Sequence, residues 1–72
     1  MTPKEEVTEI IKWMVSDRGM NLAGVERVLE LPQTHLKRLA QGSLEPTAED
    51  LTLLRTLRKH PWMVEAANDL IH

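Results

Sequence analysis

The chain has 72 residues and a formal net charge of −2, with 42% hydrophobic and 28% charged residues. This length allows one domain with a small core, because a chain of this size buries only about 60% of its unfolded surface. Its longest apolar run is three residues, whereas a membrane span needs about 20, and the absence of cysteine excludes disulfides and thiolate metal sites. We therefore expect one cytoplasmic domain over residues 1–72, with no membrane contact.

The first predicted helix begins at Thr2 and ends at Gly19. Thr2 suits the N-cap, Pro3 suits the first helical position, and Glu5 completes a capping box. Gly19 is typical of a helix end. Trp13 is predicted at the edge of the core, beside a stripe of five apolar residues at helical spacing that we expect to be buried: Val7, Ile10, Ile11, Met14 and Val15.

Two short helices are predicted next. The first follows Asn21 and ends before Pro32, which disfavours a helical residue ahead of it; its expected buried residues are Leu22, Val25, Val28 and Leu29. The second runs from Pro32 or Gln33 to Gln41, and Gly42 ends it. Because a turn of about three residues joins two helices of roughly eight to ten, we expect a helix-turn-helix at about residues 21–42.

The fourth predicted helix opens with a second capping box, formed by Thr47 and Asp50, and ends at His60–Pro61. Its apolar positions are Leu51, Leu53, Leu54 and Leu57. A fifth helix carries Trp62, Met63, Ala66, Ala67, Leu70 and Ile71. Together these elements predict an all-α fold of five short helices.

The apolar residues of the fifth helix cover an arc of about 200°, which is wider than one core contact needs. Tryptophan and methionine are enriched at interfaces. We therefore expect part of this helix to form a homodimer interface, with Trp62, Met63, Ala66, Leu70 and Ile71 shared between the core and a second copy. Two alternatives remain open: a terminal helix wrapped on the core, or a face turned towards a further domain.

The third predicted helix has two unlike sides. At about 100° per residue, one side groups Leu36, Leu39 and Ala40, and His35 falls at the boundary. The opposite arc of about 140° carries amide, hydroxyl and cationic groups: Gln33, Thr34, Lys37, Arg38 and Gln41. Residues 33–44 contain Lys37 and Arg38 but no acid, so this segment is locally basic within an acidic chain.

These residue types fit the chemistry of double-stranded DNA. Glutamine can pair bidentately with adenine and arginine with guanine, while threonine can meet a thymine methyl or a phosphate. Lysine supplies a point charge for phosphate. The first turn of such a helix points into the major groove. An ordinary solvated helix face has a similar composition, and that alternative stays open at this point.

Residues 20–57 resemble the lambda-repressor-like (Cro/C1, or XRE) helix-turn-helix family. The resemblance is carried by the run from Leu36 to Gly42, by the proline and capped helix start from Pro46 to Leu51, and by hydrophobic residues at Met20, Val25, Leu29 and Leu31. It implies a compact five-helix fold and a phage or bacterial transcriptional regulator, a repressor that binds operator DNA as a homodimer. The implied base contacts are Gln33, Thr34, Lys37 and Arg38, and further implied DNA contacts are Asn21, His35, Gln41 and Ser43.

Two residues depart from the family pattern. Glu26 stands where the family has a small alanine, and at the edge of the buried face we expect its side chain to reach out to solvent. Glu30 stands where the turn often has glycine. A left-handed conformation there would cost about 1 kcal/mol, so we expect Pro32 to shape the turn instead.

The remaining features do not predict an enzyme. The three histidines lack metal-ligand spacing, and nucleotide-binding or nucleophile motifs are absent, so we expect no cofactor, metal or small-molecule ligand. A second basic cluster, Arg55, Arg58 and Lys59, either complements the helix dipole or touches a DNA backbone. The alternative function is a protein-interaction module of the same fold, antitoxin-like or a phage regulatory partner, that does not bind DNA. The acidic net charge and the apolar fifth helix motivate it.

Overall fold

The computed structural model describes residues 1–64, which form four helices and contain no strand. The helices are α1 (Pro3–Ser16), α2 (Leu22–Val28), α3 (His35–Gln41) and α4 (Ala48–Lys59). Residues 62–64 are again helical, where the fifth helix was predicted to begin; the rest of that predicted helix lies outside the described residues. The predicted all-α class is confirmed for the described part of the chain.

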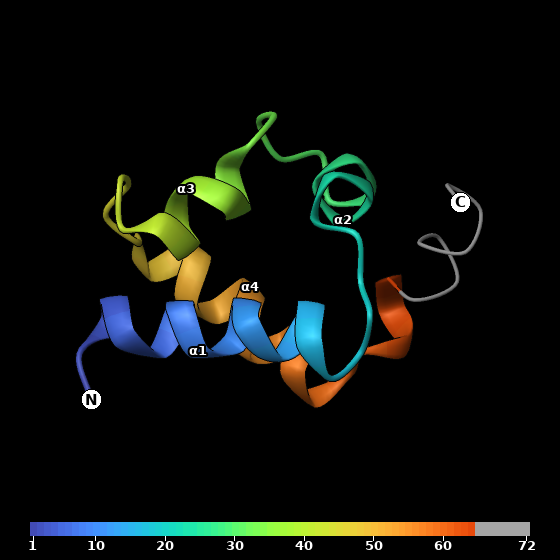
Figure 1. Ribbon diagram of the computed structural model, residues 1–72, viewed down its shortest axis with the longest axis horizontal. Helices are drawn as coiled ribbons and strands as arrows, with labels where there is room; N and C mark the ends of the chain where they lie inside the picture. Colours follow the sequence, from blue (N-terminus) through green and yellow to red (C-terminus); the bar gives the residue numbers. More distant parts are fainter. Residues whose placement is uncertain (65–72) are drawn as a thin grey trace.

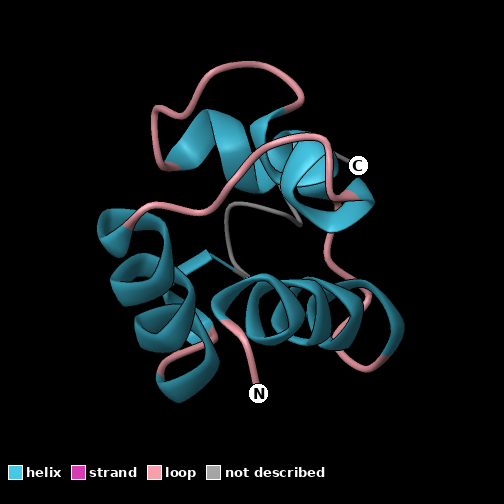
Figure 2. Ribbon diagram, turned by 90° about the vertical axis from the view of Figure 1, so that its left-hand side faces the viewer, coloured by secondary structure: helices cyan, strands magenta, loops and turns pink. Residues whose placement is uncertain are grey.

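The helices are arranged around α1, which contacts both α3 and α4, while α2 contacts α3. In Figure 1, α2 and α3 lie above α1, and α4 passes behind it. Figure 2, turned by 90°, again shows an upper and a lower group of helices. This arrangement supports α3 from below and leaves its upper side at the edge of the molecule.

Both predicted capping boxes are present. The Thr2 hydroxyl accepts the Glu5 backbone N–H at 3.2 Å, and the Glu5 carboxylate accepts the Thr2 N–H at 3.2 Å. At α4, the Thr47 hydroxyl accepts the Asp50 N–H at 3.1 Å, and the Asp50 carboxylate accepts the Thr47 N–H at 2.9 Å. Each box satisfies two backbone N–H groups that a helix start leaves without partners. The sequence signature therefore placed both helix starts correctly.

The end of α3 also follows the sequence prediction. Gly42 adopts a left-handed conformation with φ of 79°. Its N–H donates to the carbonyl of Leu39 at 3.2 Å, and the Ser43 N–H donates to the carbonyl of Arg38 at 3.0 Å. These are the two hydrogen bonds of a Schellman motif, which suits glycine because a residue without Cβ adopts this conformation at low cost.

The core collects apolar side chains from every element. Its buried members are Val7, Ile10, Ile11, Met14, Met20, Val25, Leu36, Leu39, Leu54, Leu57 and Val64. Trp13 is half-buried against this cluster, as predicted. Val15 and Val28 were predicted to be buried, but both are exposed. Each lies at the edge of its helix's apolar stripe, so the neighbouring helices cover the centre of the stripe and leave these two positions outside.

The connection between α2 and α3 is longer than predicted. Six residues, 29–34, separate Val28 from His35, where a turn of three was expected. Glu30 adopts a left-handed conformation with φ of 57°, so the prediction that Pro32 would shape the turn instead is wrong. The Leu31 N–H donates to the carbonyl of Glu26 at 2.8 Å. This Schellman-type bond ends α2 and requires the left-handed residue before Leu31.

Candidate nucleic-acid interface

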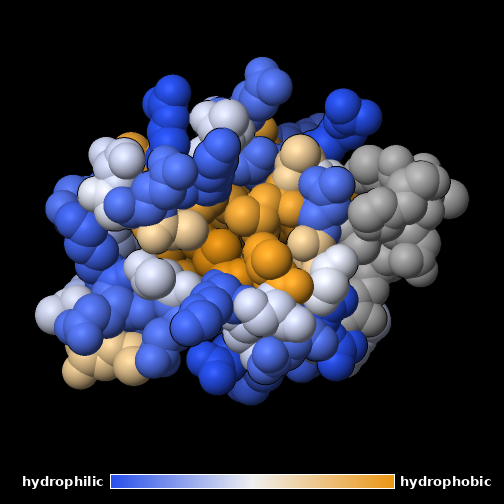
Figure 3. Space-filling model, in the orientation of Figure 1, coloured by the Kyte–Doolittle hydropathy of each residue, from blue (hydrophilic) through white to orange (hydrophobic). Residues whose placement is uncertain are grey.

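The outward side of α3 presents two cations and an amide. Lys37, Arg38 and Gln41 are exposed, whereas Leu36 and Leu39 are buried against the rest of the molecule. In Figure 3, hydrophilic side chains line the upper edge of the molecule, where α3 lies in Figure 1. No acidic residue belongs to α3. Within residues 1–64, neither Lys37 nor Arg38 forms an ion pair, so both charges face solvent.

Gln33 and Thr34 lie on the turn before α3, not on the helix. The prediction that the helix starts at Pro32 or Gln33 is wrong, because Thr34 is left-handed, with φ of 66°, and α3 starts at His35. Gln33 is exposed. The half-buried Thr34 donates its hydroxyl proton to the carbonyl of Gln33 at 2.5 Å. The two residues therefore belong to the turn, outside the arc that a helical wheel assigned to them.

His35 points towards α4 and not towards solvent. Its Nε2 lies 2.9 Å from Asp50 Oδ1, and both side chains are largely buried. Burial acts to raise the pKa of Asp50, but hydrogen bonds from the Thr47 N–H and the His35 ring outweigh it and lower that pKa below its ordinary value of 3.8. The carboxylate is therefore charged at neutral pH. The Nε2 nitrogen of His35 is therefore occupied inside the protein.

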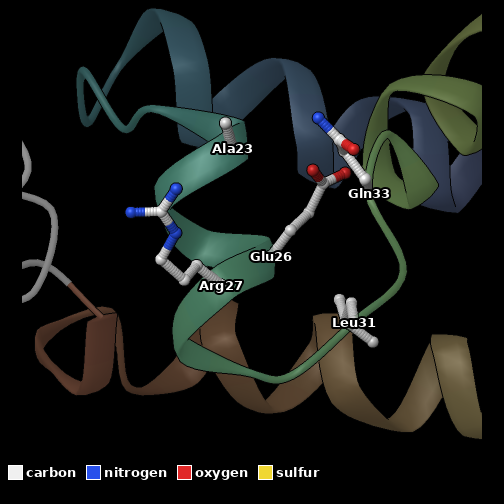
Figure 4. Close-up of a pocket in the computed structure, with 5 residues that line it drawn as sticks. All are labelled: Ala23, Glu26, Arg27, Leu31 and Gln33. Carbon is white, nitrogen blue, oxygen red and sulfur yellow. The ribbon is translucent and has the colours of Figure 1, made fainter.

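Glu26 is buried, with only 4% of its surface exposed, so the prediction that it reaches out to solvent is wrong. Its Oε1 accepts the Thr34 N–H at 3.1 Å, and its Oε2 accepts the Leu36 N–H at 2.7 Å. These two N–H groups belong to the start of α3 and would otherwise lack intrahelical partners. Figure 4 shows the Glu26 carboxylate directed from α2 towards the turn beside Gln33. Two charge-assisted hydrogen bonds thus hold the side chain inside.

Arg27 is a cationic residue that the sequence prediction missed. It is exposed on α2 and lines a shallow pocket of about 320 Å³ together with Ala23, Glu26, Leu31 and Gln33. Figure 4 shows α2 and the turn on opposite sides of this pocket. Arg27 and Gln33 therefore line one pocket between α2 and the turn that leads to α3. The available sequence signal was the spacing of Ala23 and Arg27, which puts them one helical turn apart on a single face.

Asn21 and Ser43 mark the two ends of the α2–α3 unit. The Asn21 carboxamide oxygen caps α2 by accepting the Gly24 N–H at 3.2 Å. Ser43 is exposed directly after Gly42. Both lie in loops beside helix termini, where polar groups commonly meet phosphates in DNA complexes.

The second basic cluster is engaged with α1. Arg55 Nε and an Arg55 terminal nitrogen donate to the two Glu6 carboxylate oxygens at 2.6 and 2.8 Å, and these hydrogen bonds lower the pKa of Glu6. The Arg58 guanidinium lies 5.9 Å from the centre of the Trp13 ring. These two side chains therefore join α4 to α1, while Lys59 is exposed.

The predicted dimer interface falls partly within the described residues. Trp62 and Met63 are 64% and 51% exposed, and the Trp62 ring meets the His60 ring edge-on, with 4.8 Å between centroids. Ala66, Leu70 and Ile71 lie outside the described residues. Two large apolar side chains are thus open to solvent after α4, in addition to Met1, Val15 and Val28 within residues 1–64.

Comparisons of the chain with protein-family models, curated proteins and solved structures give no match. The resemblance to the lambda-repressor-like family therefore stays a prediction. No helix within residues 1–64 has both the length and the apolar character to cross a membrane. In the same range, no group of three or more acidic or histidine side chains is placed to hold a metal ion.

Proposed function

We propose that this protein is a sequence-specific DNA-binding transcriptional regulator, a repressor that places α3 in the major groove of operator DNA. The observation that carries the proposal is the outward side of α3, where Lys37, Arg38 and Gln41 are exposed without an acidic neighbour on the helix. An α-helix with its side chains is about 10–12 Å in diameter, which fits a major groove about 12 Å wide.

Within the proposal, the residues have different tasks. Arg38 and Gln41 present side chains that can pair with base edges, and Gln33 and Thr34 lie on the turn before the helix. Lys37 and Arg27 are the phosphate contacts, with Asn21 and Ser43 at the ends of the unit. Because few cations are available, we expect weak nonspecific binding and a shallow salt dependence, in which each neutralised phosphate contributes a slope of about −0.9.

Selection of binding sites from a random pool of double-stranded DNA tests the proposal, followed by affinity measurements on the enriched site. Arg38→Ala is expected to relax the sequence preference at one position, because a good bidentate contact supplies about 1–3 kcal/mol of discrimination. Lys37→Ala is expected to weaken binding to all sequences alike and to reduce the salt slope by about one contact.

The matched control is Lys12→Ala, which removes the same charge from an exposed position on α1. It is expected to bind the selected site nearly as the wild type does. Equal affinity and equal sequence preference in wild type, Lys37→Ala and Arg38→Ala would contradict the assignment of α3 as the reading helix.

The proposed active form is a homodimer, supported by the exposed Trp62 and Met63 side chains. Twofold symmetry predicts that selected sites are palindromic, with half-sites about one helical turn of DNA, roughly 34 Å, apart. Sedimentation equilibrium of the wild type and of Trp62→Ala measures the association directly. A monomeric wild type that selects single half-sites would overturn the dimer.

The same exposed apolar pair supports a second candidate function, a protein-interaction module that does not bind DNA. The two functions predict different results in the same experiments. An interaction module yields no enriched DNA motif from the random pool and forms a stable complex with another protein, whereas the regulator enriches a motif that depends on Arg38.

A further inference from the structure

Two carboxylates belong to the most deeply buried polar residues within residues 1–64, and both hold the start of α3. Glu26 belongs to α2 and Asp50 to α4. Glu26 accepts the backbone N–H groups of Thr34 and Leu36 at 3.1 and 2.7 Å. Asp50 lies 2.9 Å from the ring nitrogen of His35. Three consecutive residues are thus fixed from two different helices.

The start of α3 needs such support. Thr34 is β-branched and nevertheless left-handed, with φ of 66°, a conformation that is unfavourable for branched side chains. Its hydroxyl makes no capping bond to α3. The helix itself has only seven residues, and isolated helices this short are not stable in water. The orientation of α3 therefore depends on contacts from outside the helix.

We infer that Glu26 and Asp50 are positioning residues for DNA recognition, which fix the direction in which α3 presents Lys37 and Arg38. This inference rests on the proposed function, because it concerns how the same helix reads DNA. Both carboxylates are buried and act through the backbone and the His35 ring. Bidentate pairing with a base edge has strict geometry, so a small rotation of α3 changes which bases Arg38 can reach.

A positioning role and a purely stabilising role predict different measurements. If the carboxylates only stabilise the fold, their loss lowers the folded fraction and weakens binding to every DNA sequence by the same factor. If they position α3, the folded variant keeps its affinity for random DNA, which phosphate contacts dominate. It loses the preference for the selected site. The ratio of the two affinities therefore separates the roles.

The first experiment compares the wild type with Glu26→Gln and Asp50→Asn at a temperature where circular dichroism shows all three folded. Glutamine keeps the size of Glu26 but offers one oxygen and places an NH₂ donor against a backbone N–H. We expect the affinity ratio between the selected site and single-base variants of it to fall about tenfold in each variant. Glu49→Gln, exposed in the first turn of α4, is the matched control and keeps the wild-type ratio.

The second experiment measures amide hydrogen exchange by NMR without DNA. In Glu26→Gln, exchange at Thr34 and Leu36 is expected to accelerate at least about tenfold, because hydrogen bonds to a charged group are lost. The amide of Met14 in α1 serves as the internal reference and keeps its wild-type rate. This measurement reports on the start of α3 even if no DNA site is known.

The outcomes distinguish the inference from the proposed function. A wild type that enriches no DNA motif overturns the proposed function and, with it, the role in recognition. A wild type that enriches a motif, with affinity ratios unchanged in folded Glu26→Gln and Asp50→Asn, overturns the inference alone. If Glu26→Gln does not fold, the affinity ratio of Asp50→Asn and its amide exchange rate at His35 distinguish the two roles in the same way.

Discussion

Because Glu30 is left-handed, we expect the protein to be more stable with glycine at position 30 than with alanine. Glu30 follows the last turn of α2 with φ of 57°, is exposed, and makes no side-chain hydrogen bond or ion pair within residues 1–64. A residue with a Cβ in this conformation costs about 1–2 kcal/mol. Glycine avoids that cost, but its greater freedom in the unfolded chain lowers the stability of the folded protein by about 0.4–1 kcal/mol. The balance favours Glu30→Gly over Glu30→Ala by about 0.5–1 kcal/mol.

The comparison with Glu30→Ala isolates the backbone, because both variants remove the same charged group. Urea unfolding followed by circular dichroism gives the two free energies of unfolding. For a domain of this size the thermal midpoint is expected to rise by about 2–8 °C from the alanine to the glycine variant. In a helix interior, glycine is about 1 kcal/mol worse than alanine. A glycine variant less stable than the alanine variant would show that residue 30 is not left-handed in the folded protein.

Three further predictions concern the core, the contact between Asp50 and His35, and the ion pair between Arg55 and Glu6. Leu54→Ala removes a fully buried side chain and is expected to lower the free energy of unfolding by about 2–5 kcal/mol, measured in urea; a loss well below this range would contradict the core position. Asp50→Asn is expected to destabilise the protein at pH 7. Because the folded pKa of Asp50 lies below its ordinary value of 3.8, the contribution is complete above that value and lost as the pH falls through the folded pKa. Urea titrations should show the two proteins converging below about pH 4, and a constant difference down to pH 2 would contradict the lowered pKa of Asp50. Arg55→Ala removes an exposed partner of Glu6 and is expected to cause a small loss of stability that shrinks in high salt; a loss independent of salt would point to packing instead.

Local sequence signals located the helix starts and ends that local chemistry controls. Thr2 and Thr47 with their acidic partners, and Gly42 after α3, fix backbone hydrogen bonds within a few residues of themselves. Such contacts form wherever the helix forms, so the pattern predicts them without knowledge of the fold. The apolar spacing in α1 and α4 likewise identified the centres of the buried stripes. The predicted burial of Val15 and Val28 was wrong because the width of the buried stripe depends on how closely the neighbouring helices approach.

The turn before α3 could not be predicted because its conformation depends on a long-range contact. Glu26 accepts N–H groups eight and ten residues further along the chain, and no periodicity reports such a bond. Without it, Thr34 and Gln33 read as ordinary helical residues on a polar face. The helical wheel therefore assigned five residues to one arc, whereas the structure leaves Lys37, Arg38 and Gln41 on the helix and two on the turn.

The positions of the acids change how the net charge of −2 bears on DNA binding. Glu26 and Asp50 are buried and hydrogen-bonded to groups at the start of α3, and Glu6 is paired with Arg55. Among the exposed residues of α2, α3 and the turn between them, the one acid is Glu30, beside three cations, Arg27, Lys37 and Arg38. An acidic chain can therefore carry a locally basic face, because some of its carboxylates hold that face from inside. Since Glu30 borders this surface, Glu30→Gly should also steepen the salt dependence of DNA binding, whereas Glu49→Gln on α4 should leave it unchanged.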